Sequence, residues 1–128
     1  MIVAGIGCRR GASAAAIEAA IAAALARASL DQSALSLIAA PADKCDESGI
    51  AAAASARGVP LVAVSELELN GAGARCVTRS ERSLARMGVP SVAEAAALAA
   101  AGATARLLLP RVALGPATCA LATNGEAP

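Results

Sequence analysis

The chain has 128 residues, the size of one domain, and its formal net charge is +1. Hydrophobic residues make up 57% of it, but no phenylalanine, tyrosine or tryptophan is present, so the core must come from alanine, leucine, valine and isoleucine. The small net charge gives no field that favours nucleic acid or an anionic membrane, and single-stranded bases would find no aromatic platform. The apolar run over residues 14–26 is too short to span a bilayer. We therefore predict neither a nucleic-acid nor a membrane partner.

The first half of the chain alternates short apolar runs with alanine-rich segments. Residues 2–7 are apolar and bounded by glycine, which is typical of a buried strand. Ser13 is a good N-cap, and Ile17, Ile21 and Leu25 recur at a spacing that gives a helix one apolar stripe. The predicted strands cover residues 2–7, 35–39 and 60–64, and the predicted helices cover residues 14–28 and a segment from Asp46 or Ser48 to about Arg57.

The second half continues this alternation and ends differently. Helices are predicted over residues 65–69, 80–87 and 92–101, and strands over residues 106–109 and 117–122. Ser91 and Glu94 have the spacing of a capping box, so Glu94 is predicted to close the start of the last helix. Pro110 and the Gly115–Pro116 pair interrupt the final strands and favour an antiparallel ending. The pattern predicts one three-layer α/β/α domain with a mostly parallel, mixed sheet over residues 1–122, and a flexible tail over residues 123–128.

The cysteines do not have the spacing of a metal site. Cys8, Cys45, Cys76 and Cys119 stand far apart, and the chain has no histidine. Zinc sites normally use closely spaced pairs, so we predict no metal and no cofactor. The chain begins directly with a strand and without a basic leader, which favours reduced thiols and a cytoplasmic location.

The strongest local signal is the glycine-rich turn from Gly5 to Ser13. A turn between a strand and a helix presents backbone N–H groups and the positive end of the helix dipole, which together bind anions. Arg9 and Arg10 add guanidinium groups suited to carboxylate or phosphate. A tight turn with two solvated arginines is the purely structural alternative, and a nucleotide site would rest on the glycines alone. Cys8 is either a thiolate favoured by this environment or a packing residue.

Three further groups of polar residues are candidates for the same site. Lys44 could meet an acidic ligand, and Glu47 could orient that ligand or act as a base, although Asp46 and Glu47 could equally cap a helix. Thr78, Arg79 and Ser80 suit a carboxylate or amide edge, with an N-cap at Ser80 as the alternative. Pro110, Arg111 and Thr118 are consistent with a strand-end loop near the site.

Five segments, in this order, resemble one known family: GIGCRRGAS, KCDESGI, GVPLVAVS, TRSERSLARMGVPSVAEAAAL and LLLPRVALGPATCALA. They are similar to the CobE family and to the C-terminal domain of the CbiG family, the cobalt-precorrin-5A hydrolase. The resemblance implies a three-layer α/β/α fold and a role in cobalamin biosynthesis, whose corrin intermediates carry many acetate and propionate arms. It assigns such a precorrin to the candidate residues as ligand, and the implied substrate-binding set is Gly7, Cys8, Arg9, Arg10, Gly11, Ser13, Lys44, Thr78, Arg79, Ser80 and Thr118.

Three functions follow from this resemblance, and the residues leave all three open. The first is to bind or deliver a carboxylate-rich precorrin. The second is hydrolysis of a precorrin-5A-type δ-lactone with release of acetaldehyde, with Glu47 as the catalytic base; the CbiG enzyme carries a further domain N-terminal to this one. The third is docking on another enzyme of the cobalamin pathway. The sequence specifies neither the intermediate, nor its cobalt content, nor the oligomeric state.

Overall fold

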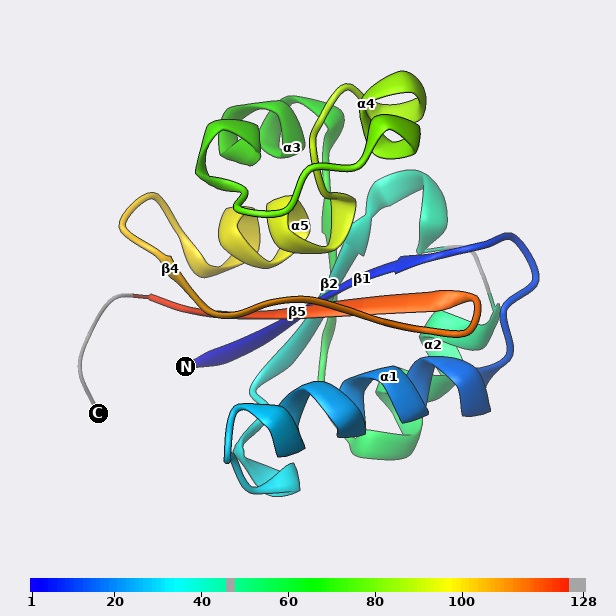
Figure 1. Ribbon diagram of the computed structural model, residues 1–128. Coiled ribbons are helices and arrows are strands. Elements are labelled where there is room, and N and C mark those ends of the chain that lie inside the picture. Colours follow the sequence, from blue (N-terminus) through cyan, green and yellow to red (C-terminus); the bar gives the residue numbers. More distant parts are fainter. Residues whose placement is uncertain (46–47, 125–128) are drawn as a thin grey trace.

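The computed structural model describes residues 1–45 and 48–124. A five-stranded sheet lies between two helical layers (Figure 1). The strands are β1 (Ile2–Cys8), β2 (Leu37–Pro41), β3 (Leu61–Val64), β4 (Arg106–Leu114) and β5 (Ala117–Thr123). The helices are α1 (Ala14–Arg27), α2 (Ser48–Arg57), α3 (Glu66–Ala72), α4 (Glu81–Met87) and α5 (Val92–Ala101), with short 3-10 turns at Gln32–Ala34, Ala42–Lys44 and Gly73–Arg75. None of the helices in the described ranges has the length and apolarity needed to cross a membrane.

The sheet is mixed, in the order β3-β2-β1-β5-β4. Strands β1, β2 and β3 are parallel, and β5 is antiparallel to both of its neighbours, β1 and β4. Four strands therefore run in one direction and β5 alone runs in the other. Helices α1 and α2 cover one face, and α3, α4 and α5 lie over the opposite face (Figure 1). The predicted three-layer α/β/α class with a mostly parallel, mixed sheet is confirmed.

Each face of the sheet has its own apolar core. The predicted stripe of α1, Ile17, Ile21 and Leu25, is fully buried against one face. On the other face, α5 packs directly on β1 at Gly5, where an added Cβ would lie 2.0 Å from the carbonyl oxygen of Ala93. Alanine-rich helices can approach a sheet this closely because their side chains are small. The absence of aromatic residues is thus matched by short distances between the layers.

The bounds of several observed elements differ from the predicted ones. Strand β2 begins and ends two residues later than predicted, and α3 continues to Ala72 rather than ending at residue 69. Strand β4 runs through Pro110 to Leu114, although Pro110 was expected to end it. Proline is tolerated there because β4 is an edge strand whose pairing with β5 shifts register between Leu109 and Val112. In the predicted tail, Thr123 belongs to β5, and residues 125–128 lie outside the described ranges.

Candidate functional site

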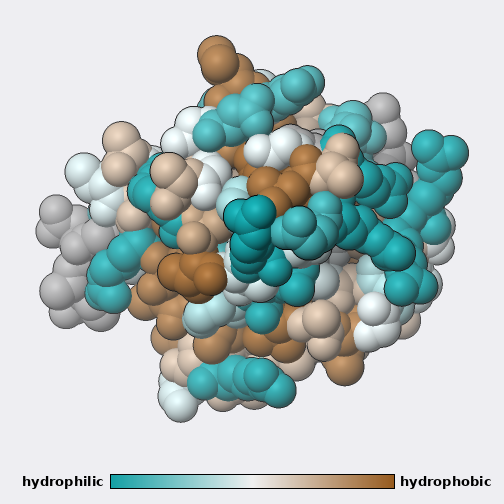
Figure 2. All heavy atoms as spheres, turned by 45° about the horizontal axis from the view of Figure 1, so that its top comes forward, coloured by the Kyte–Doolittle hydropathy of each residue, from teal (hydrophilic) through white to brown (hydrophobic). Residues whose placement is uncertain are grey.

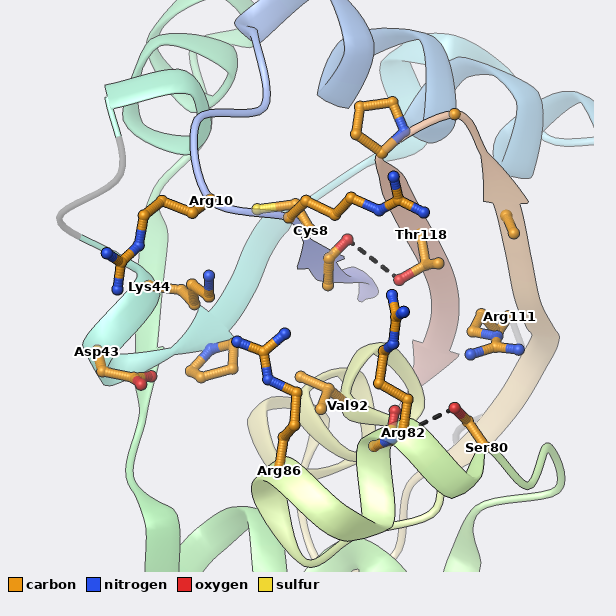
Figure 3. A pocket seen from close by; sticks show the side chains of 17 residues that line it. Cys8, Arg10, Asp43, Lys44, Ser80, Arg82, Arg86, Val92, Arg111 and Thr118 are labelled. Carbon is orange, nitrogen blue, oxygen red and sulfur yellow. Dashed lines mark hydrogen bonds between the residues drawn. The ribbon is translucent and has the colours of Figure 1, made fainter.

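A cavity of about 560 Å³ opens at the edge of the sheet where β1, β2 and β4 end and β5 begins (Figure 3). Ligands of α/β proteins usually bind at this edge. The lining residues come from the loops after β1 and β2, from α4, from the start of α5 and from the β4–β5 hairpin. They are Gly7, Cys8, Arg9, Arg10, Pro41, Asp43, Lys44, Ser80, Arg82, Ser83, Arg86, Val92, Arg111, Ala113, Gly115, Pro116 and Thr118.

The loop after β1 is held in place on two sides. The Arg9 N–H donates to the carbonyl oxygen of Pro116 over 2.9 Å, which ties the loop to the β4–β5 hairpin. Gly11 has a φ of +80°, a conformation that glycine adopts without strain. The loop also rests on α2, since a Cβ at Gly49 would lie 2.2 Å from the Ala12 carbonyl oxygen. Arg9 and Arg10 therefore project from a well-supported turn.

The base of the cavity is made of small side chains. Thr118 donates a hydrogen bond from Oγ1 to the carbonyl oxygen of Gly7 over 3.1 Å, so the two strands β1 and β5 meet closely here. A Cβ at Gly7 would lie 2.7 Å from that Oγ1. Val92 contributes the apolar contact from the start of α5. These three residues carry no charge, and the one side-chain hydroxyl among them, that of Thr118, is engaged with the Gly7 carbonyl oxygen.

Helix α4 forms the wall opposite the two loops. Ser80 caps it, because the Ser80 Oγ accepts from the Ser83 N–H over 3.3 Å and the Ser80 N–H donates to the Pro90 carbonyl oxygen over 2.8 Å. Arg82 and Arg86 stand one helical turn apart on the side of α4 that faces the cavity (Figure 3). The N-cap predicted for Ser80 is confirmed, and the same residue lines the cavity.

Glu94 fixes this wall to the sheet. The prediction that its side chain closes a capping box at the start of α5 is wrong. Its Oε1 accepts from the backbone N–H groups of Val77 and Thr78, at 2.8 and 3.0 Å, and its Oε2 accepts from the N–H of Arg111 at 2.9 Å. Ser91 does cap α5 through the Glu94 N–H, but the Glu94 side chain reaches outward to two other segments instead of closing the box. A fully buried carboxylate thus joins the segment before α4 to β4.

The hydrogen bonds keep Glu94 ionised despite its burial. Burial raises the pKa of Glu94, but the hydrogen bonds from Thr78, Arg111 and Val77 together lower it by more. The net result is a pKa below the ordinary value of a glutamate. Glu94 is therefore a charged brace behind the cavity wall and not a proton donor or acceptor within it.

The cavity is strongly cationic although the chain is nearly neutral. Six of the eleven cationic residues of the chain line it, and Asp43 is the one acid among its described lining residues. Within the described part of the chain, no hydrogen bond or ion pair engages the side chains of Arg9, Arg10, Arg82, Arg86 and Arg111. In Figure 2, hydrophilic side chains crowd the centre and right of the face that carries α3 and α4. The arrangement suits an anion with several negative groups.

The structure brings together seven of the predicted binding residues. Gly7, Cys8, Arg9, Arg10, Lys44, Ser80 and Thr118 all line the cavity. Gly11 and Ser13 support the loop, since Ser13 caps α1 by accepting from the Ala16 N–H. Arg79 lies outside the lining, is 71% exposed and pairs with Glu81 at 3.0 Å, and Thr78 bonds to Glu94. Glu47, the predicted base, lies outside the described residues.

Sequence reasoning missed two arginines of the cavity, Arg82 and Arg86, and it placed Arg111 near the site without including it in the binding set. Arg82 and Arg86 occupy an exposed helix of seven residues, whose orientation depends on how the segment from residue 77 to residue 90 docks. The i, i+4 spacing of Arg82 and Arg86 was visible in the sequence and would have placed both on one face. Arg111 follows Pro110 in the irregular part of β4, where alternation along the strand does not predict the direction of a side chain.

The cysteines offer no metal site in the described residues. The chain contains no disulfide in that part, and no cluster of three metal-binding side chains occurs there. Burial raises the pKa of Cys119 to about 12, and burial likewise raises the pKa of Cys76. Both thiols are therefore protonated packing residues at neutral pH. Cys8 is the cysteine that lines the cavity.

The fold and the cavity define a small α/β/α domain with an arginine-rich cleft at the carboxyl ends of its strands. The chain belongs to the family described as cobalamin synthesis G C-terminus, whose family model matches residues 2–122. It is a cobalamin biosynthesis protein of the CobE and CbiG C-terminal type, and the resemblance carried by the five sequence segments is confirmed.

Three solved structures support this assignment. CobE, a protein from the cobalamin biosynthetic pathway, is 34% identical with a TM-score of 0.89, over 95% of this chain and 89% of that chain. Cobalamin biosynthesis protein chiG from Agrobacterium tumefaciens is 43% identical with a TM-score of 0.79, over 98% of this chain and 100% of that chain. A cobalamin biosynthesis protein G homolog from Sulfolobus solfataricus is 27% identical with a TM-score of 0.74, and the match covers 95% of this chain but only 36% of that longer chain. A search of curated proteins found no match.

Proposed function

We propose that this protein binds a carboxylate-rich corrin intermediate in the cavity and delivers it to another enzyme of the cobalamin pathway. The observation that carries the proposal is the set of five cavity arginines that form no ion pair with any carboxylate of the described residues. A corrin precursor bears acetate and propionate arms around a macrocycle, so it matches cationic side chains around a base of small, uncharged residues. The family membership supports the same ligand class.

The expected contacts divide by chemistry. The arms of the ligand would pair with Arg9, Arg10 and Lys44 on one side of the cavity and with arginines of α4 on the other. The macrocycle would lie on the small side chains near Gly7 and Val92, since no aromatic platform exists in this chain. Charge-assisted hydrogen bonds to guanidinium groups are the strongest such contacts a protein offers.

The test is a titration of the purified protein with a corrin free acid such as cobyrinic acid. The protein has no tryptophan or tyrosine, so the ligand's absorbance can be followed without interference. We expect saturable binding that weakens as salt is added. The double substitution Arg9→Ala, Arg10→Ala should weaken binding by about 1–3 kcal/mol.

The matched control is Arg27→Ala with Arg106→Ala. Both residues are exposed and lie outside the cavity lining, and the change removes the same two charges. This variant should bind as the wild type does. Absence of saturable corrinoid binding to the wild type would overturn the proposal, and equal weakening by both double variants would reduce it to a non-specific effect of net charge.

A second candidate is hydrolysis of a precorrin-5A-type δ-lactone with release of acetaldehyde, which the resemblance to the C-terminal domain of the CbiG family implies. Glu47 remains the proposed base. Incubation with the cobalt-precorrin-5A substrate should then give acetaldehyde and a product of changed mass, and Glu47→Gln should abolish both. Bound but unchanged ligand supports delivery instead.

Docking on another cobalamin enzyme without ligand binding is the third candidate. It predicts a complex with a pathway enzyme and no corrinoid titration. We also propose a cytoplasmic location for this protein, because its four cysteines are free thiols, and fractionation of the producing cell would test this location.

A further inference from the structure

We infer that the cavity grips a flat polycarboxylate by two opposite edges, and that Arg82 and Arg86 of α4 select for carboxylates on the second edge. The inference rests on the proposed function and specifies its ligand further. It concerns where the carboxylates must sit on the ligand and not only how many it carries.

Five of the six cavity cations form two groups on opposite sides of the sheet edge, and the sixth, Arg111, comes from β4. The loop cations, Arg9, Arg10 and Lys44, follow β1 and β2 in the segments that lead toward α1 and α2. The α4 cations, Arg82 and Arg86, come from the layer over the other face of the sheet (Figure 1). In Figure 3, Arg10 and Lys44 lie on one side of the cavity while Arg82 and Arg86 rise from α4 below it.

The space between the two groups suits a plate rather than a compact anion. Its base consists of Gly7, Thr118 and Val92, and the hydroxyl of Thr118 is already engaged with the Gly7 carbonyl oxygen. A phosphate or a single carboxylate would fill only a small part of a cavity of about 560 Å³. A flat body that covers the base and carries anionic arms at both ends would engage both groups of cations.

One of the α4 cations, Arg82, stands where it does not help its own helix. Arg82 is the second residue of α4, where the positive end of the helix dipole disfavours a cation. Arg82 and Arg86 also repel one another at a spacing of one turn. Arg79, just before the same helix, pairs with Glu81 outside the cavity, whereas no carboxylate of the described residues pairs with the two α4 cations. An anionic ligand edge is the counter-charge that this geometry accepts.

The first test compares two sets of substitutions against cobyrinic acid, which carries carboxylates around the whole macrocycle. Arg82→Ala with Arg86→Ala should weaken binding at least tenfold, as should Arg9→Ala with Arg10→Ala. The charge-matched control, Arg27→Ala with Arg106→Ala, should stay within about twofold of the wild type. Wild-type affinity in the Arg82, Arg86 variant would overturn the inference and leave the proposed function standing.

The second test holds ligand charge constant and moves the carboxylates. Two mesoporphyrin isomers each carry two propionates, on one edge in the first and on opposite edges in the second. The wild type should bind the opposite-edge isomer at least tenfold more tightly, measured by porphyrin fluorescence. The Arg82→Ala, Arg86→Ala variant should bind both isomers equally.

The outcomes separate the two claims. Equal affinity of the wild type for both isomers, or no affinity for either, would overturn the two-edge inference, because two opposite carboxylates suffice under it. Failure of cobyrinic acid itself to bind would overturn the proposed function whatever the isomers do. Circular dichroism in the far ultraviolet would verify that every variant retains its helices.

Discussion

Helices α5 and α4 lie over the same face of the sheet but differ in how much of each is buried. Helix α5 buries seven of its ten residues, and its small side chains let its backbone touch β1 at Gly5. Helix α4 buries no residue whose side chain is described, and it turns two arginines toward the cavity. The comparison indicates that α5 supplies stability and that α4 supplies contacts to a ligand. Each prediction below tests one side of that division.

The largest effect is expected at the contact between α5 and β1. Gly5→Ala would place a Cβ 2.0 Å from the Ala93 carbonyl oxygen and 2.6 Å from the Ala97 nitrogen, both of them backbone atoms that cannot turn aside. Helix α5 would have to move away from the sheet. We expect the free energy of unfolding to fall by about 3 kcal/mol or more, measured by urea denaturation and far-ultraviolet circular dichroism.

Gly71→Ala is the matched control for this substitution. Gly71 lies in α3, and an added Cβ there meets no atom within 4 Å. Alanine is the better helix former, so this variant should be as stable as the wild type or more stable by up to about 1 kcal/mol. A mild effect at Gly5 would show that α5 does not depend on the close approach.

A smaller loss of stability is expected when Glu94, which joins α5 to the segment before α4 and to β4, is replaced. In Glu94→Gln, the amide group would face the Arg111 N–H or the N–H groups of Val77 and Thr78, so at least one buried donor loses its acceptor. The expected cost is about 1–3 kcal/mol in unfolding free energy. Glu81→Gln, at a carboxylate that is 80% exposed, should change stability by less than about 0.5 kcal/mol.

The same carboxylate makes stability depend on pH in a defined direction. The pKa of Glu94 is lowered in the folded state, so the contribution of Glu94 is complete above the ordinary glutamate pKa of about 4.3 and is lost as pH falls through the folded pKa. Unfolding free energy should therefore drop below about pH 4.3, and the drop should be smaller in Glu94→Gln. Glu68 also has a lowered pKa, through the Ser65 cap, and Glu68→Gln separates its share. If the free energy of unfolding falls with pH by the same amount in the wild type and in Glu94→Gln, this assignment is contradicted.

The difference between the helices also explains what the sequence could predict. The α1 stripe, the serine caps and the strand–helix alternation are local signals, and all of them hold in the structure. The loop cations Arg9, Arg10 and Lys44 follow directly from strand ends, so their meeting at one edge could be predicted from the parallel order. These parts of the site are attached directly to the strands of the sheet, and local sequence patterns therefore predict them.

The other wall of the site depends on contacts between distant segments. Glu94 has the spacing of a capping acid, yet it bonds to residues 77, 78 and 111, which local reasoning cannot bring near it. Arg79 and Arg82 are both arginines and lie three residues apart, but only Arg82 of the two lines the cavity. Which exposed arginine turns inward is decided by the docking of α4, and no periodicity in seven residues encodes it.

The smallest effect on stability is expected at Arg82, and it tests directly whether α4 serves ligand binding rather than stability. Arg82 stands at the positive end of α4 and one turn from Arg86, so its removal should relieve two unfavourable interactions. We expect Arg82→Gln to raise the free energy of unfolding by about 0.3–1 kcal/mol while lowering affinity for a corrin free acid. Arg86→Gln removes the same repulsion between the two arginines. It also removes a favourable interaction of Arg86 with the C-terminal end of the helix, so the free energy of unfolding should change less. A residue that weakens its own helix and strengthens ligand binding is retained for the ligand, and a loss of stability in Arg82→Gln would instead make α4 part of the framework, as α5 is.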